Sequence, residues 1–343
     1  MMHMQNTLYV TTPNAYLHKD GEAVVVEVDH EVRLRLPAHT LHGIVCFGVV
    51  SFSPPLMLHC AERGVSVSFL TEQGRFLARV EGPISGNVLL RREQYRWADD
   101  EKESARIAGA VVCAKVINCR VVLLRALRDY PKHEAGAKIK HAADVLQTAV
   151  SQLRPEANLD EIRGVEGNAA RTYFEVFEHL VTTQKEDFFF RARSRRPPLD
   201  NMNALLSFLY ALLGHDCRSA LESVGLDPQV GFLHRDRPGR AGLALDLMEE
   251  FRPFWADRLA LSLVNLRQVQ GKGFQKLDSG AVLMNDDTRK AVLSAYQKRK
   301  QEDIQHPFLK ERVQIGLLPY LQARLLSRYL RGDLDAYPPF FWK

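Results

Sequence analysis

The stretch Asn158–Leu180, NLDEIRGVEGNAARTYFEVFEHL, has the pattern of an amphipathic helix with one carboxylate on its apolar face. At about 100° per residue, its apolar side chains share one stripe, formed by Ile162, Ala169, Ala170, Tyr173, Phe177 and Leu180. Glu166 falls in the middle of that stripe, whereas Glu161 and Glu175 lie on the opposite face. Ionised carboxylates are rarely buried in an apolar face unless they are paired, hydrogen-bonded or bound to a metal. We therefore expect Glu166 to have a partner elsewhere in the chain.

Helical periodicity continues on both sides of this stretch. Asn158 and Glu161 form a capping-box pattern that begins the helix itself. Asp200 is placed to cap a later helix, and Asn285 another. The further expected helices are 87–130 (one helix or two), 134–153, 201–221, 285–301 and 318–330. A short β-hairpin is expected over 274–284, with its turn at Ser279-Gly280.

The first part of the chain instead has the alternating pattern of β-strands. The strand-like runs are TLYVTT, AYLHKD, EAVVVEV, VRLRLP and SVSFL, with turn signals between them. One short helix is expected over 53–62, with Ser53 as its cap. The period changes near Gly82 to Gly86. The sequence therefore predicts an α+β fold in which a small N-terminal β-rich domain, residues 1–84, precedes a larger and mostly α-helical domain, residues 85–343.

Length and composition agree with a two-domain intracellular protein. The 343 residues are enough for about two domains, and the net charge of +5 permits a polyanionic partner without demanding one. The five cysteines form no CxxC pair, so we expect a reduced cytoplasmic location and no zinc knuckle. No apolar run approaches the roughly 20 residues of a membrane span, and the start MMHMQNTLYV lacks the regions of a signal peptide. We expect no association with a membrane.

Two basic segments are candidates for contacts with nucleic acid. The first, QKEDFFFRARSRRPPLD over 184–200, carries three phenylalanines beside Arg191, Arg193, Arg195 and Arg196. Clustered arginines next to aromatic rings suit a phosphate backbone and stacked bases, although a solvated loop explains the pattern equally well. The second segment is a loop around His234 that carries Arg235, Arg237 and Arg240.

The helix after this loop has three acids close together. Asp246, Glu249 and Glu250 share one face, where like charges repel and a divalent cation would relieve the repulsion. Taken alone, an acidic helix face is more often solvated surface, and a lone loop histidine is more often a polar surface residue.

Three separated pieces of sequence fit one family in order and spacing. They are VEGNAARTYF around Glu166, GFLHRDRPG around His234, and LALDLMEEFRP around Asp246 and Glu249. With RRPPLDNMNALLSFLYALL and FQKLDSGAVLM, the chain resembles the integrase of CRISPR adaptation, most closely the members from type I systems. The resemblance covers nearly the whole chain.

This resemblance implies a catalytic metal site in the helical domain. Its catalytic and metal-binding residues would be Glu166, His234 and Glu249, with Asp246 as a further acid of the site and Glu250 outside it. Family members often have aspartate where this chain has Glu249, so Glu249, Asp246 or both would reach the metal. Oxygen and imidazole ligands without a thiolate favour Mg²⁺ or Mn²⁺ over zinc.

The resemblance also implies the reaction and the partners. The 3′-hydroxyl of a spacer-precursor DNA would attack a phosphodiester at the edge of a repeat, in two successive transesterifications. Arg235, Arg237 and Arg240 would hold phosphates around the metal, and the Arg191–Arg196 cluster would hold flanking double-stranded DNA. A homodimer and a small partner subunit are expected, with the β-rich domain supplying dimerisation and partner contacts.

Two other functions remain open from the sequence. One is a stand-alone, structure-specific endonuclease that cleaves branched DNA with water as the nucleophile. The other is a scaffold that binds nucleic acid without catalysis. The aromatic tail AYPPFFWK, with Phe340, Phe341 and Trp342, would dock either on its own domain or on a partner.

Overall fold

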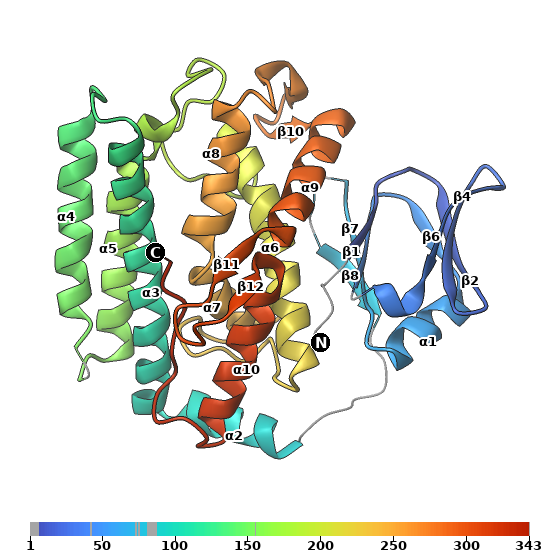
Figure 1. Ribbon diagram of the computed structural model, residues 1–343, viewed down its shortest axis with the longest axis horizontal. Helices are drawn as coiled ribbons and strands as arrows, with labels where there is room; N and C mark the ends of the chain where they lie inside the picture. The colour runs from blue at the N-terminus through green and yellow to red at the C-terminus, as the bar shows by residue number, and fades with distance from the viewer. Residues whose placement is uncertain are drawn as a thin grey trace. The chain divides into compact units, whose positions relative to one another are not determined.

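The computed structural model describes residues 7–41, 43–72, 74, 76–80, 88–154 and 156–342 (Figure 1). The chain divides into two compact units, of which the first is Met1–Gly86 together with Gln297–Glu302 and Gln314–Leu317. The second unit contains the rest of the chain. Strands dominate the first part and helices the second, which confirms the predicted α+β class. The change of period expected near Gly82 to Gly86 lies outside the described residues.

The first unit contains two four-stranded sheets. Their orders are β1-β5-β7-β8 and β4-β3-β2-β6. The elements are β1 (Thr7–Val10), β2 (Ala15–Asp20), β3 (Ala23–Val28), β4 (Glu31–Pro37), the 3₁₀ turn η1 (Ala38–Thr40), β5 (Gly43–Phe47), β6 (Val50–Phe52), α1 (Pro54–Glu62), β7 (Ser66–Leu70) and β8 (Phe76–Val80). Leu17, Ile44 and Leu56 are fully buried in the core of this unit.

The expected strands and the Ser53-capped helix are all present, but β5, β6 and β8 were not predicted. β5 pairs in parallel with both β1 and β7, and all five of its residues, GIVCF, are buried. A strand that is buried on both faces has a continuous run of apolar residues. It therefore lacks the alternation of apolar and polar residues by which the other strands were predicted.

The helical unit follows the predicted periodicity closely. Its elements are α2 (Val88–Asp99), α3 (Glu101–Asp129), α4 (Gly136–Gln152), α5 (Leu159–Glu175), η2 (Phe177–Leu180), α6 (Asn201–Ser223), α7 (Gly242–Glu249), the π-helical η3 (Arg252–Asp257), α8 (Arg258–Asn265), η4 (Gly271–Gly273), β9 (Phe274–Lys276), β10 (Val282–Met284), α9 (Asp286–Gln301), β11 (Asp303–Gln305), β12 (Arg312–Gln314), η5 (Ile315–Leu317) and α10 (Leu318–Leu330). Of these elements, η5 and the last turn of α9 are exceptions, because they belong to the first unit.

Side-chain caps set several of the helix starts. Asp100 accepts hydrogen bonds from the backbone N–H groups of Lys102 and Glu103, which divides the segment 87–130 into α2 and α3. The predicted capping box of Asn158 and Glu161 is present at the start of α5. α5 ends at Glu175, and the remainder of the expected helix is the 3₁₀ turn η2.

The long helix α3 packs against α4, α5, α7 and η3, and Figure 1 shows α3, α4 and α5 side by side. α3 is long and apolar enough to cross a membrane by length and composition, which corrects the expectation that no segment of the chain comes close to a span. Its apolar stretch is 61% buried inside the protein, as in a core helix. α3 therefore serves as the central support of the helical unit.

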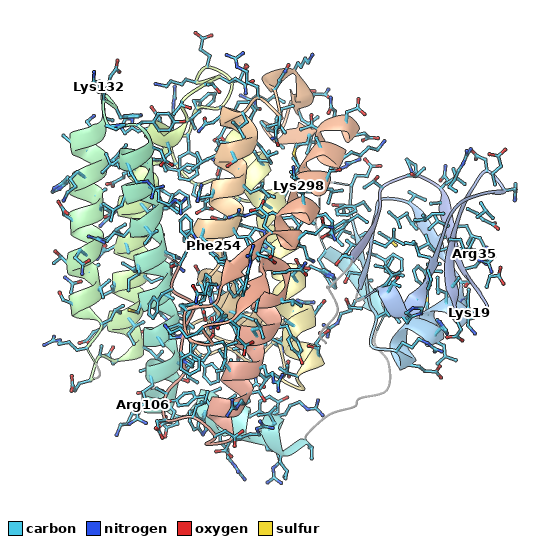
Figure 2. The ribbon with its side chains drawn as sticks, viewed as in Figure 1. Lys19, Arg35, Arg106, Lys132, Phe254 and Lys298 are labelled. Carbon is cyan, nitrogen blue, oxygen red and sulfur yellow. The ribbon has the colours of Figure 1, made fainter. Side chains whose placement is uncertain are left out.

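The aromatic tail docks on the helical unit. Phe340 is fully buried, with its ring centroid 5.0 Å from that of Phe254, which Figure 2 labels inside this unit. The backbone N–H of Trp342 donates to Oδ1 of Asn118 on α3 at 2.8 Å. Of the two docking surfaces that the sequence left open, the tail occupies the one on its own chain.

Candidate functional site

Glu166 is half-buried on α5, on the apolar side that the sequence predicts. Its partner is Lys115 of α3, whose ammonium forms an ion pair and a hydrogen bond with Oε1 of Glu166. The expectation that Glu166 has a partner is therefore confirmed, although the sequence reasoning did not identify Lys115. The available signal was a lysine in the middle of an otherwise apolar run, AVVCAKVINC over 110–119.

Lys115 also contacts a second predicted site residue. Its Nζ lies 2.8 Å from Oε2 of Glu249, at the end of α7. Burial lowers the pKa of Lys115, but the carboxylates of Glu249 and Glu166 outweigh that effect and raise it, so the side chain is an ammonium. One cation from α3 therefore lies between carboxylates from α5 and α7.

Glu249 is buried among cations, with only 2% of its side chain exposed. Its Oε1 lies 2.9 Å from Nη1 of Arg252, while Oε2 has no hydrogen bond of good geometry despite the nearby Lys115. Burial raises the pKa of Glu249, but Arg252 and Lys115 outweigh it and lower the pKa to about 2. Glu249 is thus a carboxylate with one buried oxygen atom still incompletely bonded.

His234 is oriented by Asp246. Oδ2 of Asp246 accepts from the backbone N–H groups of Phe232 at 2.7 Å and Leu233 at 3.0 Å, and Oδ1 accepts from that of His234 at 3.0 Å. The same Oδ1 lies 2.6 Å from Nδ1 of His234. Because a carboxylate only accepts, Nδ1 carries the proton that Asp246 accepts, so in the neutral imidazole Nε2, 3.9 Å from Oε1 of Glu249, is the nitrogen that can bind a ligand.

The His234 loop passes very close to α7. A Cβ atom added at Gly231 would lie 2.6 Å from the backbone of Gly242 and 2.8 Å from Oδ2 of Asp246. Only glycine fits at this position, and the close approach brings the loop N–H groups to the Asp246 carboxylate. The structure therefore links Glu249 to Glu166 through Lys115, and it places the His234 imidazole, with Asp246 behind it, next to Glu249.

Glu250 belongs to a different environment. It is fully buried and accepts hydrogen bonds from the Tyr337 hydroxyl, the Phe340 backbone N–H and the Gln322 side chain. Burial raises its pKa to about 7. Glu250 thus holds the C-terminal tail.

The seven predicted DNA-binding arginines fall into different environments. Arg193 is folded back, donating to Asn203 and Ser207 and stacking over the ring of Tyr210. Arg235 is paired with Asp160 at 2.9 Å. Arg191, Arg195, Arg196 and Arg237 are exposed, and Arg240 is half-buried.

Charges from both basic segments act on Arg240 near the site. Burial lowers the pKa of Arg240, and the charges of Arg237, Arg252 and Arg195 lower it further, against an opposing effect of Asp246. Arg195 comes from the first basic segment and Arg237 from the second. Positive charge therefore accumulates beside Glu249 and Asp246, as a bound phosphate requires.

The donor types at the site, carboxylate oxygen and imidazole nitrogen, are ones that Mg²⁺ and Mn²⁺ accept as ligands. Among the described residues, no group of three or more His, Cys, Asp or Glu side chains is placed to hold a metal. The Lys115 ammonium lies between the carboxylates of Glu166 and Glu249. Nevertheless, the site offers two carboxylates, one with an incompletely bonded buried oxygen, and an imidazole nitrogen fixed by a carboxylate behind it.

The fold and this cluster define an α+β protein whose helical unit carries a buried acidic site with one imidazole, bordered by arginines. Residues 8–298 match a family model that is described as CRISPR associated protein Cas1. The chain belongs to that family.

Relatives and solved structures agree with this assignment. The chain is 55% identical over 348 residues to a CRISPR-associated endonuclease Cas1 of Rhodospirillum rubrum, covering 100% of both chains. It resembles the structure of a casposase bound to its integration product, with a TM-score of 0.83 and 23% identity over 97% of this chain and 93% of that one. A Cas6-RT-Cas1–Cas2 complex matches with a TM-score of 0.83 and 22% identity, over 100% of this chain and 36% of that one.

Proposed function

We propose that this chain is a metal-dependent DNA endonuclease and integrase of CRISPR adaptation, which inserts spacer-precursor DNA into a repeat array by 3′-hydroxyl transesterification. The observation that carries the proposal is the ion-paired cluster in which Lys115 links Glu166 to Glu249, with Nε2 of His234 3.9 Å from Oε1 of Glu249. Bordering arginines supply the charge that a DNA backbone needs.

Glu166, Glu249 and His234 would hold Mg²⁺ or Mn²⁺, with Asp246 holding the imidazole. When bound, such an ion supplies Lewis-acid stabilisation of the transferring phosphoryl group and activates the attacking hydroxyl. Asp246 fixes the position and tautomer of His234, and Arg252 keeps Glu249 ionised. Exposed Arg237 and half-buried Arg240 are suited to hold the DNA phosphates on either side of the reacting bond.

The proposed partners are double-stranded DNA, a second copy of the chain and a small Cas2-type subunit, in the cytoplasm. Support comes from the family and from its structural neighbours. The casposase is described as bound to an integration product, and another neighbour is a complex that includes Cas2. The alternative is a stand-alone endonuclease that uses the same site on branched DNA, with water in place of the donor hydroxyl.

A strand-transfer assay separates these functions. The protein with a Cas2-type partner and Mn²⁺ should join a labelled donor 3′ end to repeat DNA. Glu166→Gln should lower the joining rate by at least about a hundredfold, the scale of losing one strong electrostatic stabiliser, with DNA binding retained. Glu175→Gln, on the exposed face of the same helix, is the matched control and should join normally.

Cleavage of branched DNA without any joining would instead identify the stand-alone endonuclease. DNA binding without either reaction, unchanged by Glu166→Gln, would indicate a scaffold. Normal joining by Glu166→Gln would remove Glu166 from the site.

A further inference from the structure

We propose that Lys115 is a tethered cation that occupies the position of the proposed metal ion and must leave it before a divalent ion binds. The inference rests on the proposed metal site. It adds Lys115, which lies outside the sequence motifs around Glu166, His234 and Glu249. It predicts that the chain's own ammonium competes with Mg²⁺ or Mn²⁺, so Lys115 sets the affinity for the metal.

The position of Lys115 carries the argument. Its Nζ contacts Oε1 of Glu166 and lies 2.8 Å from Oε2 of Glu249, the two carboxylates proposed to hold the ion. An ion that lay between these two oxygen atoms would occupy the position of the ammonium. Metal binding through Oε1 of Glu166 and Oε2 of Glu249 therefore requires the Lys115 side chain to move.

A purely structural role explains this lysine poorly. Lys115 is 7% exposed, and desolvating two charges offsets most of the attraction in a buried ion pair. An apolar side chain of similar length would fill the space between α3 and α5 without that cost. The positive charge of Lys115 is explained if it neutralises the carboxylates of Glu166 and Glu249 whenever no metal ion does so.

The surrounding groups allow the exchange. Glu166 keeps 28% of its side chain exposed, so the site is open to solvent at that carboxylate, and a lysine stem is flexible. Arg252 holds Glu249 through the other oxygen, Oε1, at 2.9 Å, so Glu249 stays ionised and in place when the ammonium leaves Oε2. Arg252 thus holds Glu249 in place through Oε1, and Lys115 pairs with Oε2 until a metal ion replaces the ammonium.

Titration calorimetry with Mn²⁺ alone tests the competition. Lys115→Met should bind Mn²⁺ more tightly than the wild type, with the dissociation constant lowered at least about fivefold, the lower range for coupled ligands. In the absence of metal, Lys115→Met should have a lower melting temperature and should gain more from added Mn²⁺ than the wild type does. Lys102→Met, an exposed lysine of the same helix, should change neither quantity.

A second measurement uses the wild-type protein and does not depend on the folding of a variant. Amine acylation followed by mass spectrometry should find Lys115 protected without metal and several-fold more reactive with Mn²⁺ bound, while Lys102 stays equally reactive. An unchanged or weaker affinity in Lys115→Met would overturn the inference, as would a Lys115 amine that stays protected when Mn²⁺ binds. If neither the wild type nor Lys115→Met binds Mn²⁺, the proposed metal site itself is wrong.

Discussion

At the scale of single residues, the site is determined by which oxygen and nitrogen atoms are already occupied. Both oxygens of Asp246 accept hydrogen bonds from the His234 loop, so this acid serves the imidazole. Glu249 has an incompletely bonded oxygen, Oε2, beside Lys115, and its Oε1 lies 3.9 Å from Nε2 of His234. Glu250, one residue later, is fully engaged by the tail. Three neighbouring acids therefore have three different tasks.

Asp246→Asn should weaken Mn²⁺ binding without removing a proposed ligand. The asparagine amide has one acceptor oxygen where aspartate has two, so it cannot accept from the loop N–H groups and also from Nδ1 of His234. The imidazole therefore loses its fixed tautomer. We expect a loss of about 10- to 100-fold in affinity by calorimetry, the usual range for such supporting groups. Asp236→Asn, an exposed acid of the same loop, is the control. Equal losses in both variants would contradict the assignment.

Asp257 should make stability depend on pH. It is 1% exposed and accepts from the Tyr210 hydroxyl at 2.6 Å, and burial raises its pKa from 3.8 to about 6. A raised carboxyl pKa gives stability that is complete below the unfolded value and is lost as pH rises through the folded value. Relative to Asp257→Asn, the wild type should lose up to about 3 kcal/mol of unfolding free energy between pH 4 and 6.

Denaturant unfolding across this pH range measures the difference. The exposed Asp278→Asn serves as the control and should follow the wild type at every pH. A constant difference between the wild type and Asp257→Asn would show that Asp257 does not titrate in this range.

Sequence periodicity can identify a misplaced charge but not its distant partner. Glu166 stood out because it interrupted an apolar stripe, whereas Lys115 precedes it by 51 residues on another helix. Likewise, Arg193 and Arg195 are equivalent in the sequence pattern. Only the fold shows that Arg193 turns inward to Asn203 while Arg195 remains exposed.

At the scale of elements, the C-terminal tail connects α3, which carries Lys115, with the end of α7, which carries Glu249. The Asn118 side chain of α3 donates to the carbonyl groups of Glu250, at 2.7 Å, and Phe340, at 2.9 Å. Glu250 directly follows Glu249, and Asn118 lies one turn beyond Lys115. The tail thereby supports both sides of the ion-paired cluster.

Phe340→Ala should destabilise the helical unit by about 3–5 kcal/mol, the usual cost of removing a buried phenylalanine. Phe340 is fully buried against Phe254, whereas the adjacent Phe341 is only half-buried. Thermal unfolding of Phe340→Ala and Phe341→Ala provides a matched comparison. Equal, small shifts in melting temperature would mean that the tail is not docked in solution.

Helices were easier to anticipate than strands for a physical reason. Caps and a 3.6-residue period are local, and α10 begins and ends at the predicted residues. Parallel pairing such as that of β5 with β7 is non-local, and a fully buried strand leaves no alternating pattern. For the same reason, the sequence did not reveal that the last turn of α9 and η5 join the first unit.

At the scale of the whole molecule, charge placement matters more than the net charge of +5. Exposed Arg195 belongs to the first basic segment and half-buried Arg240 to the second, and the charge of Arg195 lowers the pKa of Arg240. Arg193 is held within the helical unit. DNA affinity should therefore depend on the exposed arginines, and folding on Arg193.

Arg195→Ala should weaken DNA binding and reduce the slope of log affinity against log salt by about one phosphate contact, with no change in melting temperature. Arg193→Ala should lower the melting temperature because it removes hydrogen bonds to Asn203 and Ser207. Binding to a labelled duplex over a range of salt concentrations, with thermal unfolding in parallel, measures both effects. The reverse pattern would show that the two arginines are assigned to the wrong tasks.

The most direct test of the central claim is a crystal structure with Mn²⁺, in which anomalous scattering locates the ion. We predict a peak bonded to Glu166, Glu249 and Nε2 of His234, with Asp246 still on Nδ1 and the Lys115 ammonium displaced. A peak bonded to Asp246 or Glu250 instead, or a protein saturated with Mn²⁺ whose Glu166 and Glu249 still hold Lys115 between them, would contradict the account.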